Sequence, residues 1–579
     1  MKKILFFLIS ILLFSCEKQD DYSSNGSSQV NFSDNFGNSA QRSFLVQIVD
    51  VNNLPIKDAV INIGLDQKNT DSNGICIIEN ANVYEKFAYI KVQKNGYING
   101  SRSLVPTSGV NIVKIMMINK NLISTINTGV TANVALSNGT NVTFDGFFED
   151  ENGNNYSGPV EVFAYHLEKS NSNIDKLMPG MLFAQTDNGS AKVLQTYGML
   201  NVELTGSSGE KLQIAQGHTA EISMKIDNTQ LSNVSSTIPL WHFDEENGYW
   251  IEEGEATRQG DYYVGSVSHF SWWNVDAYQS MATLNVTIVD GENNPIPNLE
   301  VMLTDQNGYT STTLTTNQNG NVSGLIPTNN NLTLEVSGII NYQEQIGSFT
   351  SNSSITIVIS TANLNTFNFT GNVLDCNNNS FSNGYVVITT NNYIQYLPII
   401  NGTFSTSYAT YQDLINYSVY AVNFGNNEFS TLINDQADVT VSNSILINDL
   451  VVCLNSNTIN LAGDFNLVVT RDDGNTYTFP NEIIQLVGPN NYKTTTTGSW
   501  NAGTIAQDQG YNFSINNLNG IIVPSQGLCQ GYYTNVVVGE NYNGSSSNGL
   551  IISNDEFYIT YSITFQSGPR VYTCHYLRN

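Results

Sequence analysis

Apolar and polar residues alternate along most of the chain, and this period of two is its dominant pattern. Segments such as FLVQIVD at 44–50 and LNVTIVD at 284–290 carry apolar side chains at alternate positions. Side chains of a β-strand point to its two faces in turn, so each segment predicts a strand with one buried face. No window combines a sustained helical period with capping residues. The pattern therefore predicts an all-β fold.

Two stretches of the chain repeat a longer pattern, which indicates a repeated domain. In both, an Ile-Val-Asp triplet precedes a proline by five residues, at Pro55 and Pro295. Both then reach a Thr-x-x-Asn-Gly turn that ends at Gly74 and Gly320. Proline lacks the N–H donor of a ladder and belongs at a strand start, and Asn-Gly accepts the positive φ of tight hairpins.

The repeated pattern resembles the carboxypeptidase regulatory-like domain, a transthyretin-like β-sandwich, over residues 43–118 and 279–362. The resemblance implies a fold and not a peptidase activity. The His-Glu-x-x-His motif of zinc peptidases does not occur in the chain. A third segment, 363–455, alternates in the same way but has Ser380 where the repeat has proline, so we expect a degenerate third sandwich there.

The stretch between the two repeats has landmarks of its own. Apolar segments at 240–243 and 249–251 flank the polar turn DEENG, which predicts a β-hairpin. The segment YYVGSVSHFSWWNVD follows at 262–276. These residues resemble a β-rich domain of cartilage intermediate layer protein, and over 119–278 the resemblance implies an extracellular structural or adhesive role.

Aromatic residues and histidines gather in this middle stretch. We consider Trp241 and Trp250 as ligand-stacking residues, with packing inside the hairpin as the default interpretation. Four histidines fall on separate predicted strands, so we expect core or rim residues rather than a metal site: His166, His218, His242 and His269. An acidic segment at 150–154 raises the option of bound Ca²⁺, but it lacks the later Glu of an EF-hand, and a hairpin turn is expected. No cofactor is predicted.

The start of the chain reads as an export signal. Two lysines precede an apolar core at 4–14, which is shorter than the roughly 20 residues that a spanning helix needs. The core ends in Leu-Phe-Ser-Cys, which resembles a bacterial lipobox and implies acylation of Cys16 and removal of residues 1–15. A flexible tether is expected over 16–42, where the composition is polar.

The residues after the lipobox resemble the surface-export signal of Bacteroidetes lipoproteins: Lys18, Asp20 and Asp21. The resemblance implies a lipid-anchored protein on the outer face of the outer membrane, with a periplasm-facing position as the alternative. The predicted fold class is therefore a series of tandem Ig-like/transthyretin-like β-sandwich domains after a lipoprotein signal peptide.

Charge and cysteine content limit the kinds of partner and the disulfides that can be expected. The chain has 22 Lys and Arg against 50 Asp and Glu, a net charge of −28, which argues against a nucleic-acid partner because phosphate contacts need a basic face. Cys76 is expected to be a buried thiol. The last third holds four cysteines, for which the plainest pairing is Cys376–Cys453 and Cys529–Cys574, with the other pairings open. A zinc site is the alternative, without a Cys-x-x-Cys spacing to support it.

A chain of 579 residues is too long for one core. The C-terminal domain predicted at 456–579 matches no family that we can name, and its Tyr532 and Tyr533 are candidate ligand-binding aromatics. We predict a non-enzymatic surface rod of β-sandwiches for adhesion or for binding a glycan or an extracellular protein. The alternatives are an accessory subunit of an outer-membrane uptake or secretion complex and a secreted hydrolase, for which no catalytic motif is found.

Overall fold

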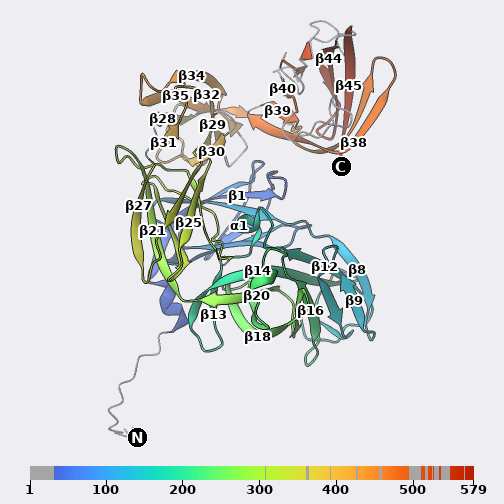
Figure 1. Cartoon of the computed structure of the whole chain (residues 1–579). Coiled ribbons are helices and arrows are strands. Elements are labelled where there is room, and N and C mark those ends of the chain that lie inside the picture. The colour runs from blue at the N-terminus through green and yellow to red at the C-terminus, as the bar shows by residue number, and fades with distance from the viewer. Residues whose placement is uncertain are drawn as a thin grey trace, which may run out of the picture.

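The computed structural model describes residues 31–579 except 307, 339, 360–363, 391–392, 425–427, 456–459, 489, 495–509, 516–519, 525, 527–533, 536–547 and 566–567. Almost all regular structure in this part is β, as predicted (Figure 1). The described helices are short: η1 (Phe32–Phe36), α1 (Ile174–Leu177) and η2 (Leu231–Asn233). Within the described residues no helix has the length and apolar character to span a membrane.

The first sandwich has two sheets, of strand order β4-β1-β7 and β3-β2-β5-β6. Its strands are β1 (Ser39–Asp50), β2 (Val60–Ile63), β3 (Asp66–Asn69), β4 (Ile75–Tyr84), β5 (Ala88–Gln93), β6 (Gly100–Leu104) and β7 (Val110–Met117). The first strand is antiparallel to β4 and parallel to β7. The alternating residues predicted to face inward form the core, which includes Phe44, Val46, Ile48 and the buried Cys76.

The second sandwich repeats this topology, with sheets β24-β21-β27 and β23-β22-β25-β26. Its strands are β21 (Met281–Asp290), β22 (Glu300–Asp305), β23 (Leu314–Thr315), β24 (Asn321–Pro327), β25 (Leu332–Ser337), β26 (Tyr342–Ile346) and β27 (Ser353–Ile359). Here too the first strand, β21, is antiparallel to the fourth and parallel to the last.

A third sandwich follows, in which the first strand again pairs antiparallel with the fourth and parallel with a late strand, in the sheet order β31-β28-β35. Its strands are β28 (Asn365–Asp375), β29 (Gly384–Thr390), β30 (Tyr393–Pro398), β31 (Thr403–Thr410), β32 (Leu414–Asn423), β33 (Glu428–Phe429), β34 (Ile433–Asp438), β35 (Ser444–Val452) and β36 (Leu454–Asn455). These three units are the tandem sandwiches that the alternating pattern predicts.

The three sandwiches share one loop after their first strand. An isolated β-bridge joins the end of that strand to a residue further along the loop: Val49–Pro55, Val289–Pro295 and Leu374–Ser380. Ser380 therefore occupies the position that proline has in the other two, as the sequence alignment of the repeats predicted. Proline is accepted at this position because the strand edge needs no N–H donor there.

The aspartate before each loop closes it. Its Oδ1 atom accepts backbone N–H groups two and four residues later, at 2.8–2.9 Å for Asp50, Asp290 and Asp375. Asp150 makes the same contacts with Asn152 and Asn154, at 2.9 and 3.0 Å. The acidic segment considered for Ca²⁺ is thus an aspartate turn of the same kind, as expected.

The middle domain is built on a 13-stranded sheet. Its strands are β8 (Leu122–Asn127), β9 (Ala132–Ala135), β10 (Asn141–Phe144), β11 (Phe148–Asp150), β12 (Pro159–Leu167), β13 (Phe183–Gln185), β14 (Ala191–Gly206), β15 (Lys211–Ile214), β16 (Ala220–Lys225), β17 (Thr237–Asp244), β18 (Tyr249–Gln259), β19 (Tyr262–Val267) and β20 (Trp272–Gln279). The predicted hairpin is present as β17 and β18, which pair antiparallel.

The C-terminal domain has a nine-stranded sheet. Its strands are β37 (Gly463–Arg471), β38 (Thr476–Gly488), β39 (Asn491–Thr494), β40 (Asn512–Ile515), β41 (Ile521–Ile522), β42 (Thr534–Asn535), β43 (Gly549–Ile551), β44 (Glu556–Phe565) and β45 (Gly568–Arg578). Several tyrosines contribute to its core, where the hydroxyls of Tyr511 and Tyr576 hydrogen-bond at 2.8 Å.

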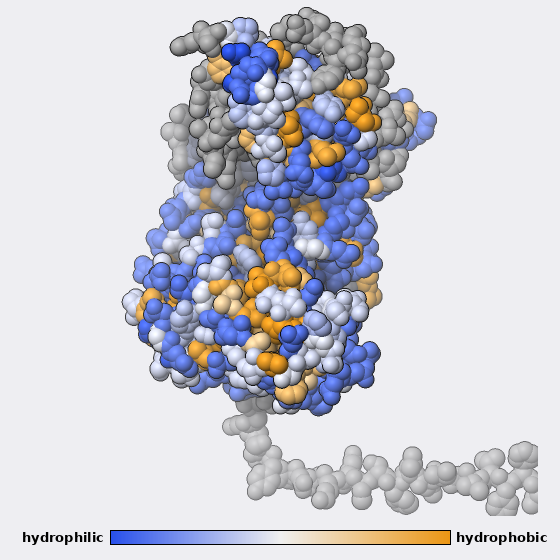
Figure 2. Space-filling model, turned by 90° about the vertical axis from the view of Figure 1, so that its right-hand side faces the viewer, coloured by the Kyte–Doolittle hydropathy of each residue, from blue (hydrophilic) through white to orange (hydrophobic). Residues whose placement is uncertain are grey.

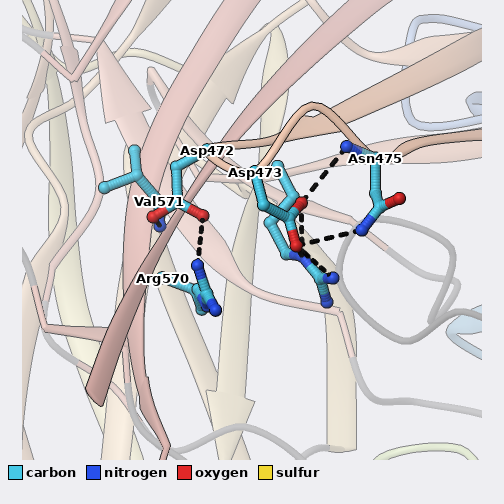
Figure 3. Close-up of polar contacts among 6 residues, drawn as sticks. Asp472, Asp473, Asn475, Arg570 and Val571 are labelled. Carbon is cyan, nitrogen blue, oxygen red and sulfur yellow. Dashed lines mark hydrogen bonds and ion pairs between the residues drawn. The ribbon is translucent and has the colours of Figure 1, made fainter. Parts of the chain in front are cut away.

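The β37–β38 turn of this domain carries paired charges. Arg471 contacts Asp473 at 2.5 Å, Asp473 accepts the Asn475 side-chain amide at 2.9 Å, and Arg570 reaches Asp472 at 3.4 Å (Figure 3). These groups are exposed, so we assign them to the local order of the turn rather than to a binding site.

The first sandwich, the middle domain and the second sandwich form one packed body. One hydrophobic cluster contains residues of all three, among them Met116, Trp241 and Leu284. The third sandwich joins the first through a second cluster that includes Leu45 and Tyr385. Figure 1 shows the C-terminal domain at the opposite end of the molecule from the middle domain.

Part of the predicted tether is ordered. Phe32 is buried in η1, and its ring lies 5.0 Å from that of Phe183 and 4.7 Å from that of Tyr249. The first strand begins at Ser39. The expectation of a flexible tether is therefore wrong for residues 32–42. The aromatic side chain of Phe32, in an otherwise polar stretch, packs on aromatic residues of the middle domain.

Candidate functional site

A cleft of about 970 Å³ lies where the three sandwiches and the C-terminal domain meet. Strands β1 and β7 of the first sandwich, β22 of the second and β30 of the third line it, together with the ends of β37 and β38. Polar and apolar surface contribute equally to the wall, whose polar and aromatic residues include Tyr97, Lys114, Glu300, Gln395 and Gln485. A site of this size, shared by several domains, is typical of ligand-binding clefts.

Gln395 gives the cleft an unusual polar group. The side chain lines the cleft and is only 6% exposed. Neither its amide nitrogen nor its amide oxygen has a hydrogen-bond partner among the described residues. A buried amide without partners is unfavourable, by about 1–3 kcal/mol for each unpaired group, and both amide atoms of Gln395 are buried beneath the surface of the cleft.

Charged groups on the wall have shifted pKa values. Burial lowers the pKa of Lys114, against the opposing effect of Glu300. Burial raises the pKa of Asp464, and Asp50 adds to the rise. Tyr97, whose pKa is raised by burial and then by Asp50 and Asp464, therefore lies near both carboxylates. Tyrosine, amide and carboxylate groups can bind the hydroxyls of a glycan or the backbone of a peptide.

The titratable side chains that line the cleft among the described residues are those of Asp, Glu, Lys, Arg and Tyr. Neither histidine nor cysteine occurs among the described residues that line it. Asp50, one of its carboxylates, already accepts two backbone N–H groups of its own loop.

The two tryptophans proposed from sequence as ligand contacts are fully buried, at 0% exposure. Trp241 donates its indole N–H to the carbonyl of Asp276 at 3.0 Å, and Trp250 packs on Phe243 at 5.2 Å. Their prediction as a stacking surface is therefore wrong, and hairpin packing explains them. They do not pair with each other, because Trp241 lies opposite Glu252 in the ladder.

Several predicted site residues lie outside the described part of the chain: Cys16, Lys18, Asp20, Asp21, Cys529, Tyr532 and Tyr533. They remain predictions. The predicted pair Cys376–Cys453 is a disulfide, between the end of β28 and the end of β35. Cys574 is buried in the core of the C-terminal domain, and its pairing with Cys529 stays a prediction.

The hairpin turn at 244–248 does not project freely. Tyr89 of the first sandwich donates its hydroxyl to the carbonyl of Glu245 at 2.9 Å, and Lys91 pairs with Glu246 at 2.7 Å. Ser103 donates to the carbonyl of Gly248 at 2.6 Å. The acidic turn thus helps to hold the first sandwich against the middle domain.

The histidines of the middle domain divide into two groups. His166 is buried beside Thr140, and His218 pairs with Asp145 at 2.6 Å, so both have structural partners. His242 and His269 instead meet at Glu253. Sequence spacing missed this group because β17 is paired with both β18 and β20, which brings separate segments together.

Burial and neighbouring charges shift the pKa values of His242 and Glu253 in this second group. Burial lowers the pKa of His242, and the neighbouring His269 lowers it further, against the effect of Glu253. The pKa of Glu253 is lowered although burial opposes the change, because His269 and Ser268 hydrogen-bond to it.

Comparison with known proteins gives limited likeness. The chain is 28% identical over 118 residues to mouse cartilage intermediate layer protein 2, and 28% identical over 116 residues to the human protein. Each match covers 20% of this chain and 10% of the relative, so the chain spans about a tenth of these relatives. No protein-family model matches the chain.

Solved structures similar to the chain include pilins. A streptococcal ancillary pilin has 11% identity and a TM-score of 0.14, covering 39% of this chain and 97% of the pilin. The major pilin subunit of Bacillus cereus has 12% identity and a TM-score of 0.12, covering 55% and 99%. Likenesses of this size carry no argument about assembly or function.

Proposed function

We propose that the protein is a non-enzymatic cell-surface lipoprotein that binds an extracellular glycan or protein through the cleft between its sandwiches. The observation that carries the proposal is the cleft of about 970 Å³, which residues of the three sandwiches and the C-terminal domain line together. Its tyrosine, amide and carboxylate groups match the chemistry of a hydroxyl-rich or peptide ligand. Acylation of Cys16 would anchor the chain, with Lys18, Asp20 and Asp21 as the export signal to the outer face of the outer membrane.

The arrangement of the domains supports this function. The first described residues pack on the middle domain through Phe32, whereas the cleft is lined in part by the C-terminal domain, at the opposite end of the molecule (Figure 1). A lipid anchor at the N-terminus would therefore leave the cleft directed away from the membrane.

A binding experiment with the full chain tests the proposal. Fluorescently labelled protein is applied to arrays of glycans and of extracellular-matrix proteins. We expect one class of ligand to bind, and Tyr97→Ala and Gln485→Ala each to weaken that binding at least about tenfold, as expected for the loss of one well-placed contact. Tyr411→Ala is the control, because Tyr411 is exposed and does not line the cleft. Binding that both cleft variants retain would contradict the assignment.

An accessory subunit of an outer-membrane complex is the second candidate. Exposed apolar side chains on or beside β8 and β9 favour it: Leu122, Ile123 and Val130. Figure 2 shows apolar side chains gathered on the lower half of the molecule in this view. Crosslinking on intact cells distinguishes the two candidates. An accessory subunit would give a crosslink to one defined membrane partner, and Ile123→Glu would abolish that crosslink.

A further inference from the structure

Three side chains of the middle domain, His242, Glu253 and His269, converge at one place near its surface. Nδ1 of His242 lies 2.9 Å from Oε2 of Glu253, and Nε2 of His269 lies 3.2 Å from the same oxygen. The three donor atoms all lie within 4.8 Å of one another. We propose that these residues form a binding site for a first-row divalent cation, Zn²⁺ in particular.

The spacing fits a tetrahedral ion. Zn²⁺ binds imidazole nitrogen and carboxylate oxygen at about 2.0–2.2 Å, so neighbouring donors around it are about 3.3 Å apart. The two distances to Glu253, 2.9 and 3.2 Å, are close to this spacing, and the donor nitrogens of His242 and His269 lie within 4.8 Å of each other. The side chains are 18%, 36% and 40% exposed for His242, His269 and Glu253, so an ion can enter and keep a fourth position for water.

The surrounding structure holds the donors in place. His242 lies on β17 and Glu253 on β18, and His269 lies in the loop before β20. Trp273 of β20 packs its ring 5.7 Å from that of His242 and 5.1 Å from that of His269, and its indole N–H donates to the carbonyl of His269 at 3.0 Å. Ser268 donates to the other oxygen of Glu253 at 3.0 Å. Such supporting contacts are typical of metal sites, where they fix ligand orientation.

One donor atom of the cluster is not satisfied by a well-oriented hydrogen bond. Nδ1 of His242 is buried and has no hydrogen bond of acceptable geometry among the described residues, although Glu253 is only 2.9 Å away. An imidazole and a carboxylate that both bind one metal ion lie this close to each other without a hydrogen bond between them. Two imidazoles and one carboxylate favour Zn²⁺ over Ca²⁺ or Mg²⁺, which prefer oxygen ligands only.

Calorimetric titration of the chelator-treated full chain with Zn²⁺ tests the site. We expect about one tightly bound equivalent that millimolar Ca²⁺ does not displace. His242→Gln, Glu253→Gln and His269→Gln should each weaken binding at least about tenfold. His218→Gln is the matched control, because His218 pairs with Asp145 in the same domain and should leave Zn²⁺ binding unchanged. Equal Zn²⁺ affinity in the wild type and all three ligand variants would overturn the proposal.

A second measurement needs no variant. Cu²⁺ prefers the same donors, and a paramagnetic ion within a few ångströms of Trp273 should quench part of the tryptophan fluorescence. We expect saturable quenching that excess Zn²⁺ reverses. Absence of both saturable Zn²⁺ binding and reversible quenching in the folded wild-type chain would also overturn the proposal.

Discussion

Tyr385 of the third sandwich donates its hydroxyl hydrogen to Oδ2 of Asp71 in the first sandwich, at 2.6 Å, across 314 residues of chain. The same hydroxyl accepts the side-chain N–H of Asn73 at 2.7 Å. Asp71 and Asn73 belong to the turn before β4, which the sequence identifies as the Asn-Gly turn of the repeat. A turn that is only a connection in one sandwich is thus also a docking surface for another.

Replacing Tyr385 by Phe should weaken this contact. The variant keeps the ring but leaves the partly buried Asp71 and the buried Asn73 without this partner, and we expect a loss of about 1–3 kcal/mol in the free energy of unfolding. Urea denaturation of the full chain measures it. Tyr411→Phe, at a side chain that is 43% exposed, should leave the transition unchanged. Equal midpoints for both variants would contradict a stabilising role for the contact.

Asp276 predicts a pH dependence of stability. Its carboxyl is fully buried, and burial holds its pKa well above the usual 3.8. Between 3.8 and the folded-state pKa the folded protein binds more protons than the unfolded chain, so this group makes stability fall as pH rises. Asp276→Asn should remove that fall, and its stability relative to the wild type should increase with pH above about 4 in paired thermal melts.

Asp473 serves as a control, because its effect on stability should change with pH in the direction opposite to that of Asp276. Hydrogen bonds from Arg471 hold its pKa below the usual value, at the turn drawn in Figure 3. Its stabilising effect is present above 3.8 and is lost as pH falls through the folded-state pKa. Asp473→Asn should therefore become slightly less stable than the wild type as pH rises. The same sign for both variants would show that burial does not govern Asp276.

The disulfide of the third sandwich should stabilise that domain. Cys376 and Cys453 are 77 residues apart in sequence, and a closed loop of this length corresponds to about 4 kcal/mol on the chain-entropy account. Cys376→Ser with Cys453→Ser should lower the unfolding temperature of one transition in calorimetry. Reduction of the wild type should reproduce the shift, and an unchanged transition would be inconsistent with the disulfide.

Gly320 should tolerate no side chain. It has φ +69°, and a Cβ there would lie 2.3 Å from the carbonyl oxygen of Ile288. Gly153 has a similar φ of +75° but nothing within 4 Å, so Gly153→Ala measures the backbone strain alone, about 1–2 kcal/mol. Gly320→Ala should cost clearly more in denaturant unfolding. Similar losses for the two variants would mean that the loop moves aside.

The alternating pattern was enough to predict the β class, the repeat and the third sandwich. A strand with one buried face requires apolar residues at every second position, and this period is visible in the sequence. The bridge at Ser380 shows that even the degenerate repeat keeps the backbone arrangement of the proline. The disulfide between Cys376 and Cys453 was the plainest of the open pairings, because both cysteines lie within one predicted domain.

The sites could not be predicted in the same way. Trp241 was misassigned because a strand pattern shows which residues share a face and not whether another domain covers that face. The cleft depends on four domains, and the convergence of His242 with His269 depends on β17 lying between β18 and β20. Contacts between segments that are distant in the chain produce no periodic pattern of residues that a single sequence would reveal.

The parallel pairing of β1 with β7 has a mechanical consequence. The first strand begins at Ser39, directly after the segment that would lead to a lipid anchor, and its later residues line the cleft. Tension between membrane and ligand would run along this strand, which is flanked by hydrogen-bonded neighbours on both sides. Its lateral hydrogen bonds would be sheared together rather than opened one by one, so the protein is expected to resist pulling from its N-terminus more strongly than pulling on an edge strand such as β3.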